Sequence, residues 1–312
     1  MPARIITIQP EQAGQRLDNF LVTQLKGVPK SKIYNIIRSG EVRVNSGRIK
    51  HLYRLVSGDA IRIPPIRVSR GDACVAHDQR TLDTLTSRIL YEDKGLLILN
   101  KPSGMAVHGG SGISLGVIEN LRALFPREKS LELVHRLDRE TSGCLVVSKK
   151  PSILKQLHTL LREAQGVEKT YVALVQGDWP KKLTRIDEPL HKNQLSSGER
   201  IVRVHSEGKP SLTLFKVLER FGWATLVEAT PKTGRTHQIR VHALHAGHPL
   251  AGDEKYGNKV FNKEMRQHGC KRLFLHAAKI AFTLPDTEQY IAVSAPLDSD
   301  LDIFLEHIRA AD

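Results

Sequence analysis

One segment of the chain, residues 135–143, reads His-Arg-Leu-Asp-Arg-Glu-Thr-Ser-Gly. Its aspartate, Asp138, stands between two guanidinium groups, those of Arg136 and Arg139. An aspartate beside fixed cations is expected to stay ionised, because opposite charge favours its charged form. An ionised and partly desolvated carboxylate can attack as a nucleophile or stabilise a cation that develops at a sugar carbon. A structural ion pair or a helix cap is the competing interpretation, and this segment alone leaves both open.

A second candidate is Tyr171, which lies in the run Lys-Thr-Tyr-Val-Ala-Leu-Val of residues 169–175. The alternation of this run predicts a strand with Tyr171, Ala173 and Val175 on one face. A tyrosine on such a face could stack on a base and use its hydroxyl as a proton donor or base. The same pattern also fits an ordinary core side chain, so the run by itself supports two interpretations.

A third polar segment, residues 233–242, reads Thr-Gly-Arg-Thr-His-Gln-Ile-Arg-Val-His. Four histidines occur in it or just after it, namely His237, His242, His245 and His248. They invite a metal interpretation, yet none belongs to an H-E-x-x-H motif and no cysteine lies nearby. Arg235 and Arg240 would repel a cation, so no metal is expected. Arginine and histidine beside a turn are better suited to phosphate contacts, which we assign to Arg235 and His237.

The remaining glycine-rich and cysteine-containing positions do not predict a cofactor site. Residues 100–104, Asn-Lys-Pro-Ser-Gly, follow an apolar run and predict a tight turn. The patterns G-x-x-x-x-G-K-[ST] and G-x-G-x-x-G are both absent from the chain. Cys74, Cys144 and Cys270 are odd in number and far apart, which fits a reducing compartment better than a disulfide framework. We therefore expect no cofactor and a cytoplasmic location.

The elements that must position these segments read as strands with a few amphipathic helices between them. Strands are predicted at residues 89–91, 96–99, 144–147 and 169–175. A final helix is predicted through Leu301, Phe304, Leu305 and Ile308. Many strands joined by hairpin-like turns favour a mostly antiparallel sheet, and therefore an α+β fold class.

The first quarter of the chain is its most basic part. In the whole chain, Lys and Arg outnumber Asp and Glu by 47 to 33, which gives a net charge of +14. Residues 1–80 hold 14 of these cations and 6 of the acids, so they carry +8 by themselves. A surplus of this size favours RNA or DNA as a partner, because each cation placed against a phosphate releases a condensed counterion. A solvated charged rim is the alternative.

Two short amphipathic helices and several small strands are predicted in this basic quarter. Apolar residues recur at helical spacing in two sets, Leu17, Phe20 and Leu21, then Ile33, Ile36 and Ile37. Gly40 is the expected stop of the second helix, and residues 42–44 and 61–63 alternate as strands do. The basic side chains fall off the apolar faces and could form one RNA-binding surface, made of Arg16, Lys30, Lys32, Arg38 and Arg43.

Three short motifs in this quarter point to a known kind of domain. They are Arg-Leu-Asp-x-Phe-Leu from residue 16, Ile-Arg-x-Gly-x-Val-x-Val-Asn from residue 37, and Gly-Asp at residues 58–59. Together they resemble the S4 RNA-binding domain. The resemblance implies a small S4 domain at residues 14–66. The composition shift that begins at Pro64 and Pro65 indicates a linker, which we place at residues 67–86. A larger catalytic domain would follow at residues 87–312.

The chemical segments of the larger part also occur together in a known family. In order along the chain, residues 100–104, 135–143, 169–177 and 233–242 resemble the pseudouridine synthases of the RluA type, which isomerise uridine in RNA. The His-Arg-Leu-Asp segment with its Thr-Ser-Gly end is the most specific of the four. The resemblance implies the pseudouridine synthase fold, an α+β domain with a mostly antiparallel sheet.

The same resemblance implies roles for individual residues. Asp138 would be the nucleophile, and Tyr171 would stack on the target uracil and could move a proton. Arg240 would pair with the aspartate, while Arg136 would help to open the RNA around the target. With an S4 domain in front, the resemblance implies large-subunit (23S-type) ribosomal RNA as the partner of a monomeric protein, with no cofactor and no membrane.

Two other functions remain open on the sequence alone. An S4-bearing RNA methyltransferase would need a glycine-rich nucleotide site on a parallel sheet, and the only comparable run, residues 108–112, lacks that setting. A non-enzymatic RNA-binding or ribosome-assembly module would not need the carboxylate of Asp138 at all.

Overall fold

The computed structural model describes residues 3–25, 28, 30–66, 77–109, 115–163, 166–194 and 200–311. The chain divides into two compact units, Met1–Ala76 and His77–Asp312, here called the small unit and the large unit. Each unit has a hydrophobic core of its own, as separate domains do. Across the described residues, no helix is both long enough and apolar enough to span a membrane.

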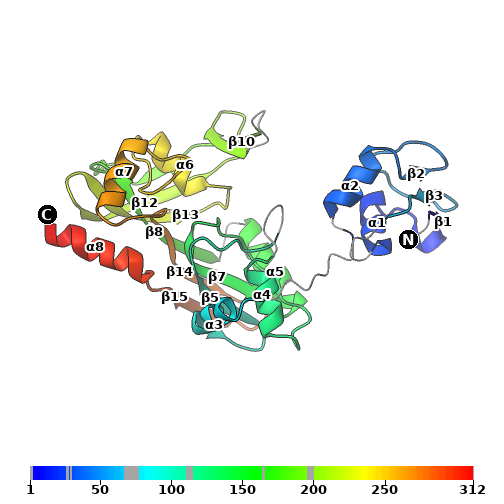
Figure 1. Ribbon diagram of the computed structural model, residues 1–312, viewed down its shortest axis with the longest axis horizontal. Coiled ribbons are helices and arrows are strands. Elements are labelled where there is room, and N and C mark those ends of the chain that lie inside the picture. The colour runs from blue at the N-terminus through cyan, green and yellow to red at the C-terminus, as the bar shows by residue number, and fades with distance from the viewer. Residues whose placement is uncertain are drawn as a thin grey trace. The chain divides into compact units, whose positions relative to one another are not determined.

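The small unit combines a three-stranded antiparallel sheet with two helices (Figure 1). In sheet order its strands are β1 (Arg4–Thr7), β3 (Ala60–Ile63) and β2 (Arg43–Val44). Its helical elements are the 3-10 turn η1 (Pro10–Gln12) and the helices α1 (Leu17–Gln24) and α2 (Lys30–Arg38). Both helices and the two strands expected from the sequence are confirmed, whereas β1 was not predicted.

The helices of the small unit form because their apolar stripes meet in one core. Six apolar residues of α1 and α2 are buried there, namely Leu17, Phe20, Leu21, Ile33, Ile36 and Ile37. Gly40 ends the α2 segment with φ +77°, a left-handed conformation that glycine adopts without steric penalty. Lys30 begins α2, but its side chain lies outside the described residues.

The large unit holds the remaining elements of Figure 1. Its helices are α3 (Gln79–Ser87), α4 (Val117–Leu124), α5 (Pro151–Glu163), α6 (Gln238–His245), α7 (Lys259–Gln267) and α8 (Ser299–Ala311). Its strands are β4 (Ile89–Glu92), β5 (Leu96–Lys101), β6 (Glu132–Leu133), β7 (Ser142–Ser148), β8 (Val167–Gln176), β9 (Arg185–Asp187), β10 (Leu190–Gln194), β11 (Arg200–Val204), β12 (Leu212–Arg220), β13 (Ala224–Pro231), β14 (Leu275–Thr283) and β15 (Tyr290–Ser294).

Ten strands of the large unit form one sheet, in the order β4-β5-β7-β14-β8-β13-β12-β9, with β6 paired to β7 and β15 to β14. Within the described residues, β7 and β14 form its one parallel pair, and all its other pairs are antiparallel. The predicted α+β class with a mostly antiparallel sheet is therefore confirmed. The centre of the sheet is β14, which joins β7 on one side to β8 on the other.

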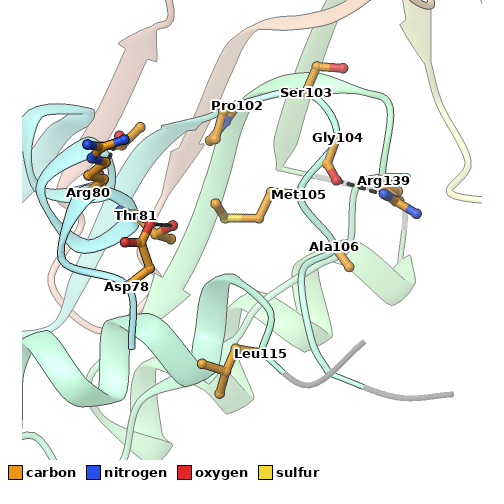
Figure 2. A pocket seen from close by; sticks show the side chains of 11 residues that line it. Asp78, Arg80, Thr81, Pro102, Ser103, Gly104, Met105, Ala106, Leu115 and Arg139 are labelled. Atoms are coloured by element: carbon orange, nitrogen blue, oxygen red, sulfur yellow. Dashed lines mark hydrogen bonds between the residues drawn. The ribbon is translucent and has the colours of Figure 1, made fainter. Parts of the chain in front are cut away.

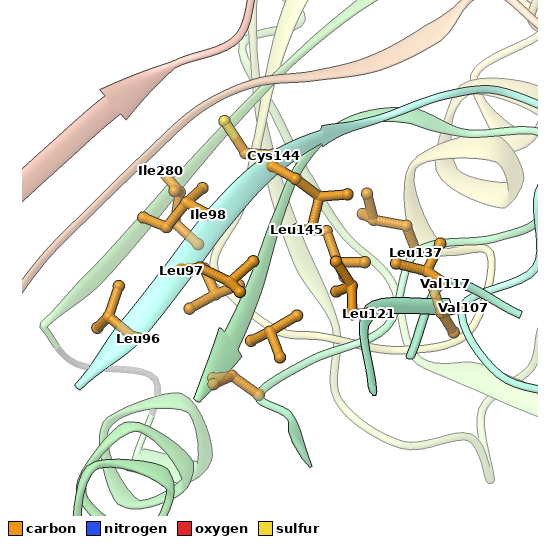
Figure 3. Close-up of a cluster of buried hydrophobic side chains, with 14 of the residues drawn as sticks. Leu96, Leu97, Ile98, Val107, Val117, Leu121, Leu137, Cys144, Leu145 and Ile280 are labelled. Atoms are coloured by element: carbon orange, nitrogen blue, oxygen red, sulfur yellow. The ribbon is translucent and has the colours of Figure 1, made fainter. Parts of the chain in front are cut away.

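The main core of the large unit lies where helices α3, α4 and α5 pack on β5 and β7. Every residue of β5 is buried, because neighbouring elements cover both faces of this strand. Figure 3 shows Leu96, Leu97 and Ile98 of β5 beside Leu145 of β7. Leu137 belongs to the same cluster, although it lies in the loop before β7.

The structure differs from the expected linker at residues 67–86. Residues 77–86 belong to the large unit, and most of them form α3. Asp78 caps this helix by accepting a hydrogen bond from the Thr81 N–H, and Leu85 is completely buried in the main core. Most residues of this stretch are polar, so the sequence shows no clear helical spacing of apolar residues there. The first part of the expected linker, residues 67–76, lies outside the described residues.

Candidate active site

A cleft of about 1200 Å³ opens on the large unit. Among the described residues, eight cations and three acids line it. The cations are Arg122, Arg136, Arg162, Lys169, Lys192, Arg235, Arg240 and Lys255, and the acids are Glu119, Glu132 and Asp138. Such a lining attracts a polyanion, because the low-dielectric walls of a cleft focus the field of its charges.

The cleft brings together six residues that the sequence singled out in three separate segments. They are Arg136, Asp138, Tyr171, Arg235, His237 and Arg240. Asp138 comes from the loop before β7, and Tyr171 comes from β8. Arg235 and His237 come from the loop before α6, and Arg240 comes from α6 itself. The segments meet because β7 and β8 both lie beside β14 in the sheet.

Asp138 lies in a loop that is anchored on both sides of it. Leu137, directly before it, is 7% exposed and packs in the main core. After it, Ser142 at the start of β7 hydrogen-bonds His276 of β14, with 2.8 Å between Oγ and Nδ1. Gly143 has φ +106°, and a Cβ atom there would lie 2.3 Å from the carbonyl oxygen of Ala277. Within the Thr-Ser-Gly end of the motif, Ser142 and Gly143 therefore allow β7 to pack closely against β14.

The turn at residues 100–104 fastens the backbone that follows Asp138. The ammonium group of Lys101 is buried and donates to three backbone carbonyls, including that of Arg139 at 3.0 Å. The Arg139 guanidinium donates in turn to the carbonyl of Gly104 at 2.9 Å, as the dashed line between these two residues in Figure 2 shows. A smaller cavity of about 550 Å³, drawn in the same figure, lies beside this turn.

Arg240 connects Asp138 to a second, fully buried carboxylate. Its Nη1 donates to Asp138 Oδ2 at 3.0 Å, and its Nε and Nη2 donate to the two oxygens of Asp253 at 2.7 and 2.8 Å. Asp253 also accepts the backbone N–H groups of Lys255 and Tyr256. Burial opposes both charges, but these hydrogen bonds outweigh it, so the pKa of Arg240 is raised and that of Asp253 is lowered. Arg240 is therefore a permanent cation in a fixed orientation.

Tyr171 and Lys169 lie on the same face of β8, two residues apart, and both line the cleft. Burial raises the pKa of the Tyr171 phenol, and the negative charge of Asp138 raises it further. The hydroxyl therefore keeps its proton near neutral pH. Burial also lowers the pKa of the Lys169 amine, because the charged form loses hydration there.

His237 lies between Asp138 and Tyr256. Its Nδ1 is 2.7 Å from the Tyr256 hydroxyl oxygen, and its Nε2 is 3.8 Å from Asp138 Oδ2. The backbone of His237 has φ +54°, in the left-handed region that residues with a Cβ seldom adopt. Its side chain is 17% exposed, so only part of the ring faces the open cleft.

The two arginines predicted to contact RNA in the large unit are exposed at the cleft. Arg136 precedes Asp138 by two residues, and its neighbour Leu137 points into the core. Arg235 donates from Nε to the carbonyl of Pro210 at 3.1 Å, which holds its stem while its other nitrogens stay accessible. Both guanidinium groups are thus available to a ligand in the cleft.

The predicted RNA-binding cations of the small unit differ in how free they are. Lys32 and Arg38 are exposed on α2, and Arg43 on β2 is partly buried. Arg16 is bound to the buried Asp18 by two hydrogen bonds of 3.1 and 2.6 Å. Its charge is therefore largely used within the small unit.

Comparison with known proteins identifies the family. A family model described as RNA pseudouridylate synthase matches residues 95–245, and an S4 domain model matches residues 15–61. Over 310 residues the chain is 56% identical to "Ribosomal large subunit pseudouridine synthase C" of Salmonella typhi, which covers 98% of this chain and 97% of that protein. The chain belongs to the RNA pseudouridylate synthase family.

Two further relatives of this pseudouridine synthase differ in how similar their sequences are to it. The protein of the same name from Pasteurella multocida is 55% identical over 307 residues, or 98% of this chain and 94% of that one. The solved structure of "Human RNA Pseudouridylate Synthase Domain Containing 4" is 27% identical and superposes with a TM-score of 0.61. That match covers 74% of this chain and 96% of the human chain.

These matches confirm the predicted family, its enzymatic class, the S4 domain in front and the pseudouridine synthase fold. The methyltransferase alternative falls away, since it required a nucleotide site on a parallel sheet. The roles of individual residues in the synthase stay predictions.

Sequence reasoning missed several residues that shape this site. Asp253 and Tyr256 hold Arg240 and His237, and Lys101 fastens the backbone after Asp138. Asp253 and Tyr256 belong to the run Gly-Asp-x-x-Tyr-Gly of residues 252–257, which is visible in the sequence. No spacing rule connects that run to Arg240, which lies thirteen residues before Asp253. The sequence therefore shows the run but does not show which residue it contacts.

Proposed function

We propose that this pseudouridine synthase isomerises uridines of large-subunit ribosomal RNA, with Asp138 as the nucleophile. The substrate class is supported by relatives of 55–56% identity that carry the name ribosomal large subunit pseudouridine synthase C. One observation carries the role of Asp138: a fixed cation holds one of its oxygens at the edge of a basic cleft, and the side chain is still 30% exposed. Cytoplasmic action is part of the proposal.

The reaction suits a site without an external group donor. Conversion of uridine to pseudouridine breaks the bond between N1 and C1′ and forms a bond between C5 and C1′. The proton of C5 is lost, and N1 gains one, so atoms and electrons balance within the nucleotide and its proton carriers. The base must leave its stack to reach the cleft, which costs a few kcal/mol that stacking and phosphate contacts offset.

The two oxygens of Asp138 have different surroundings, and this difference suggests their tasks. Oδ2 accepts the hydrogen bond of Arg240, whereas Oδ1 accepts none from the described residues. Oδ1 is therefore the atom that would meet the target nucleotide. Arg240 would stabilise the carboxylate between turnovers and keep it from rotating, because three of its hydrogen bonds fix the guanidinium plane. Attack on the sugar, attack on the base and elimination to a glycal all start from this contact.

Tyr171 would stack on the uracil and donate a proton instead of accepting one. Its raised pKa keeps the phenol neutral, so it is a poor base near pH 7. A neutral hydroxyl beside Asp138 can protonate or hydrogen-bond a carbonyl of the detached base. The aromatic ring offers a face on which the base can turn while water is excluded from the cleft.

The remaining cations would bind the RNA backbone around the target. Arg136 and Arg235 stand at the cleft and would contact phosphates or fill the gap that the everted base leaves. The exposed Lys32, Arg38 and partly buried Arg43 of the small unit would contribute affinity. These contacts do not touch the reacting atoms, so binding and chemistry should be separable in variants.

The Asp138→Asn variant tests the nucleophile. We expect turnover on ribosomal RNA to fall by about 1000-fold or more, since the amide cannot attack, while RNA affinity stays within about tenfold. Tritium release from uridine labelled at C5 measures turnover, and filter binding measures affinity. Glu140→Gln is the matched control, because it removes an exposed neighbouring carboxylate of the same loop and should remain active. Appreciable turnover by Asp138→Asn would falsify the assignment.

Carbodiimide mapping of RNA from cells with and without the protein tests the substrate. Pseudouridine keeps the carbodiimide adduct and stops reverse transcription, so each modified position gives a stop. We expect stops in large-subunit ribosomal RNA to disappear in cells that lack the protein and to return with the wild-type chain. Loss of stops only in transfer RNA would contradict the proposed substrate.

A further inference from the structure

His237 is held in an uncommon backbone conformation by the elements around it. It stands directly before α6, and its φ of +54° is unusual for a residue with a Cβ. Such outliers persist where the surrounding structure enforces them, and they gather at functional sites. Here the conformation directs the ring into the space between Asp138 and Tyr256. Glycine adopts a positive φ without steric cost. The presence of histidine at this position therefore suggests that its imidazole has a function.

The contacts of Tyr256 favour one tautomer of His237. The backbone N–H of Val202 donates to the Tyr256 hydroxyl oxygen at 3.0 Å, so this oxygen already acts as an acceptor. Its own proton is then available to His237 Nδ1, 2.7 Å away. With Nδ1 as an acceptor, the neutral ring carries its proton on Nε2, the nitrogen that faces Asp138.

Burial, more than the neighbouring charges, favours the neutral form of the His237 ring. Burial lowers its pKa, and Arg240 and Lys255 lower it further, against the opposite influence of Asp138 and Asp253. A neutral ring with its N–H toward a carboxylate is a directional donor and adds no net charge to the cleft. The distance of 3.8 Å from Nε2 to Asp138 Oδ2 is too long for a hydrogen bond, and such contacts often tighten only when substrate is bound.

We propose that His237 is a positioning residue for Asp138: the ring is held by Tyr256, its Nε2–H and the Arg240 guanidinium both face Oδ2, and Oδ1 is left to face the target nucleotide. This inference rests on the proposed role of Asp138 and assigns His237 a task other than phosphate binding. The partner on the far side of the ring, Tyr256, is the group that fixes its tautomer.

The His237→Gly variant separates this role from folding. Glycine relieves the positive φ but adds freedom to the unfolded chain, so the two effects oppose each other and the melting temperature should stay within about 4 °C. We expect kcat to fall by about 10- to 100-fold, with KM for the RNA within about threefold, because only the reacting geometry is disturbed. Added imidazole should restore part of kcat.

Two companion variants complete the experiment. Asparagine tolerates the left-handed conformation and offers an N–H, so His237→Asn should keep more kcat than His237→Gly. Tyr256→Phe removes the hydroxyl that contacts His237 Nδ1, so the ring can adopt either tautomer. This variant should lower kcat by about 3- to 10-fold at unchanged KM. It also keeps the test valid should His237→Gly not fold.

Two results would overturn the inference. One is an unchanged kcat with KM raised about tenfold and a weaker salt dependence, which would make His237 a phosphate contact. The other is wild-type kinetics in His237→Gly. Asp138→Asn is measured in parallel: its continued turnover would remove the nucleophile assignment, whereas an inactive Asp138→Asn beside a fully active His237→Gly removes only this inference.

Discussion

The two units of this synthase use their cations in different ways. In the small unit, Lys32 and Arg38 lie exposed on α2, where water and salt screen them. In the large unit, the Arg240 side chain is 9% exposed and shares its hydrogen bonds between two carboxylates. An exposed cation acts through its charge, whereas a buried one acts through its geometry. The number of basic residues in a unit therefore does not indicate which cation takes part in chemistry.

Among the substitutions of cations, that of the buried Arg240 is expected to have the largest effect. Arg240→Gln leaves the fully buried Asp253 without its partner and Asp138 without its anchor. We expect kcat to fall by at least about 100-fold and unfolding free energy to fall by about 3–5 kcal/mol, because an unpaired charge stays buried. Single-turnover kinetics and urea unfolding measure the two quantities.

Arg309→Gln is the matched control for that variant. Arg309 binds Glu219 in a pair whose side chains are 45% and 34% exposed. Exposed pairs contribute about 1 kcal/mol or less, so this variant should keep both kcat and stability. Equal losses in the two variants would erase the contrast between buried and exposed cations.

Deletion of residues 1–76 tests the other side of the comparison. Each unit has its own core, so the large unit should fold and keep kcat at saturating RNA within about threefold. We expect Kd for RNA to rise by about 10- to 1000-fold, and the slope of log Kd against log salt to shrink by about 2–3. Binding isotherms at four salt concentrations measure both. An unchanged slope would show that the small unit does not contact phosphates.

Acid should weaken the large unit through a histidine that lines the cleft. Burial lowers the pKa of His135 to about 4, and its Nε2 accepts the N–H of Val146. The unfolded chain, with an ordinary pKa near 6.5, binds more protons between these values, so stability is complete above pH 6.5 and falls toward pH 4. We expect this residue to contribute about 2–3 kcal/mol of that loss. Urea unfolding of His135→Gln should show a shallower fall over the same window, and an equal fall would contradict the assignment.

The smallest effect is expected from one exposed cation. Arg38→Gln should raise Kd by a few-fold and lower the salt slope by about 1, with kcat unchanged. Lys263→Gln removes an exposed cation of α7 outside the cleft lining and should change neither value. Equal effects of the two substitutions would mean that net charge, not the α2 surface, governs binding.

Much of the architecture could be predicted because its signals are local. Helices α1 and α2 carry apolar residues at helical spacing, and β4, β5, β7 and β8 carry apolar runs of strand length. The helix α3 escaped notice because only Leu85 of its nine residues is fully buried. A single apolar contact does not produce a periodic pattern.

The site itself could be predicted only in part. Asp138, Tyr171 and Arg240 were predicted as site residues through the family resemblance of their segments, and the structure brings them to one cleft. Their partners did not stand out, because Asp253 and Tyr256 meet Arg240 and His237 only after α6 and the following loop have packed together.

By itself, the sequence determined which chemical groups are available and which part of the chain carries the larger surplus of positive charge, since both follow from composition and short-range order. The tertiary structure alone decided that Arg240 and His237 both face Oδ2 of Asp138, while Oδ1 accepts no hydrogen bond from the part of the chain that the structure describes. Such a choice between two oxygens depends on distances of about 3 Å between segments a hundred residues apart, and no linear pattern encodes them.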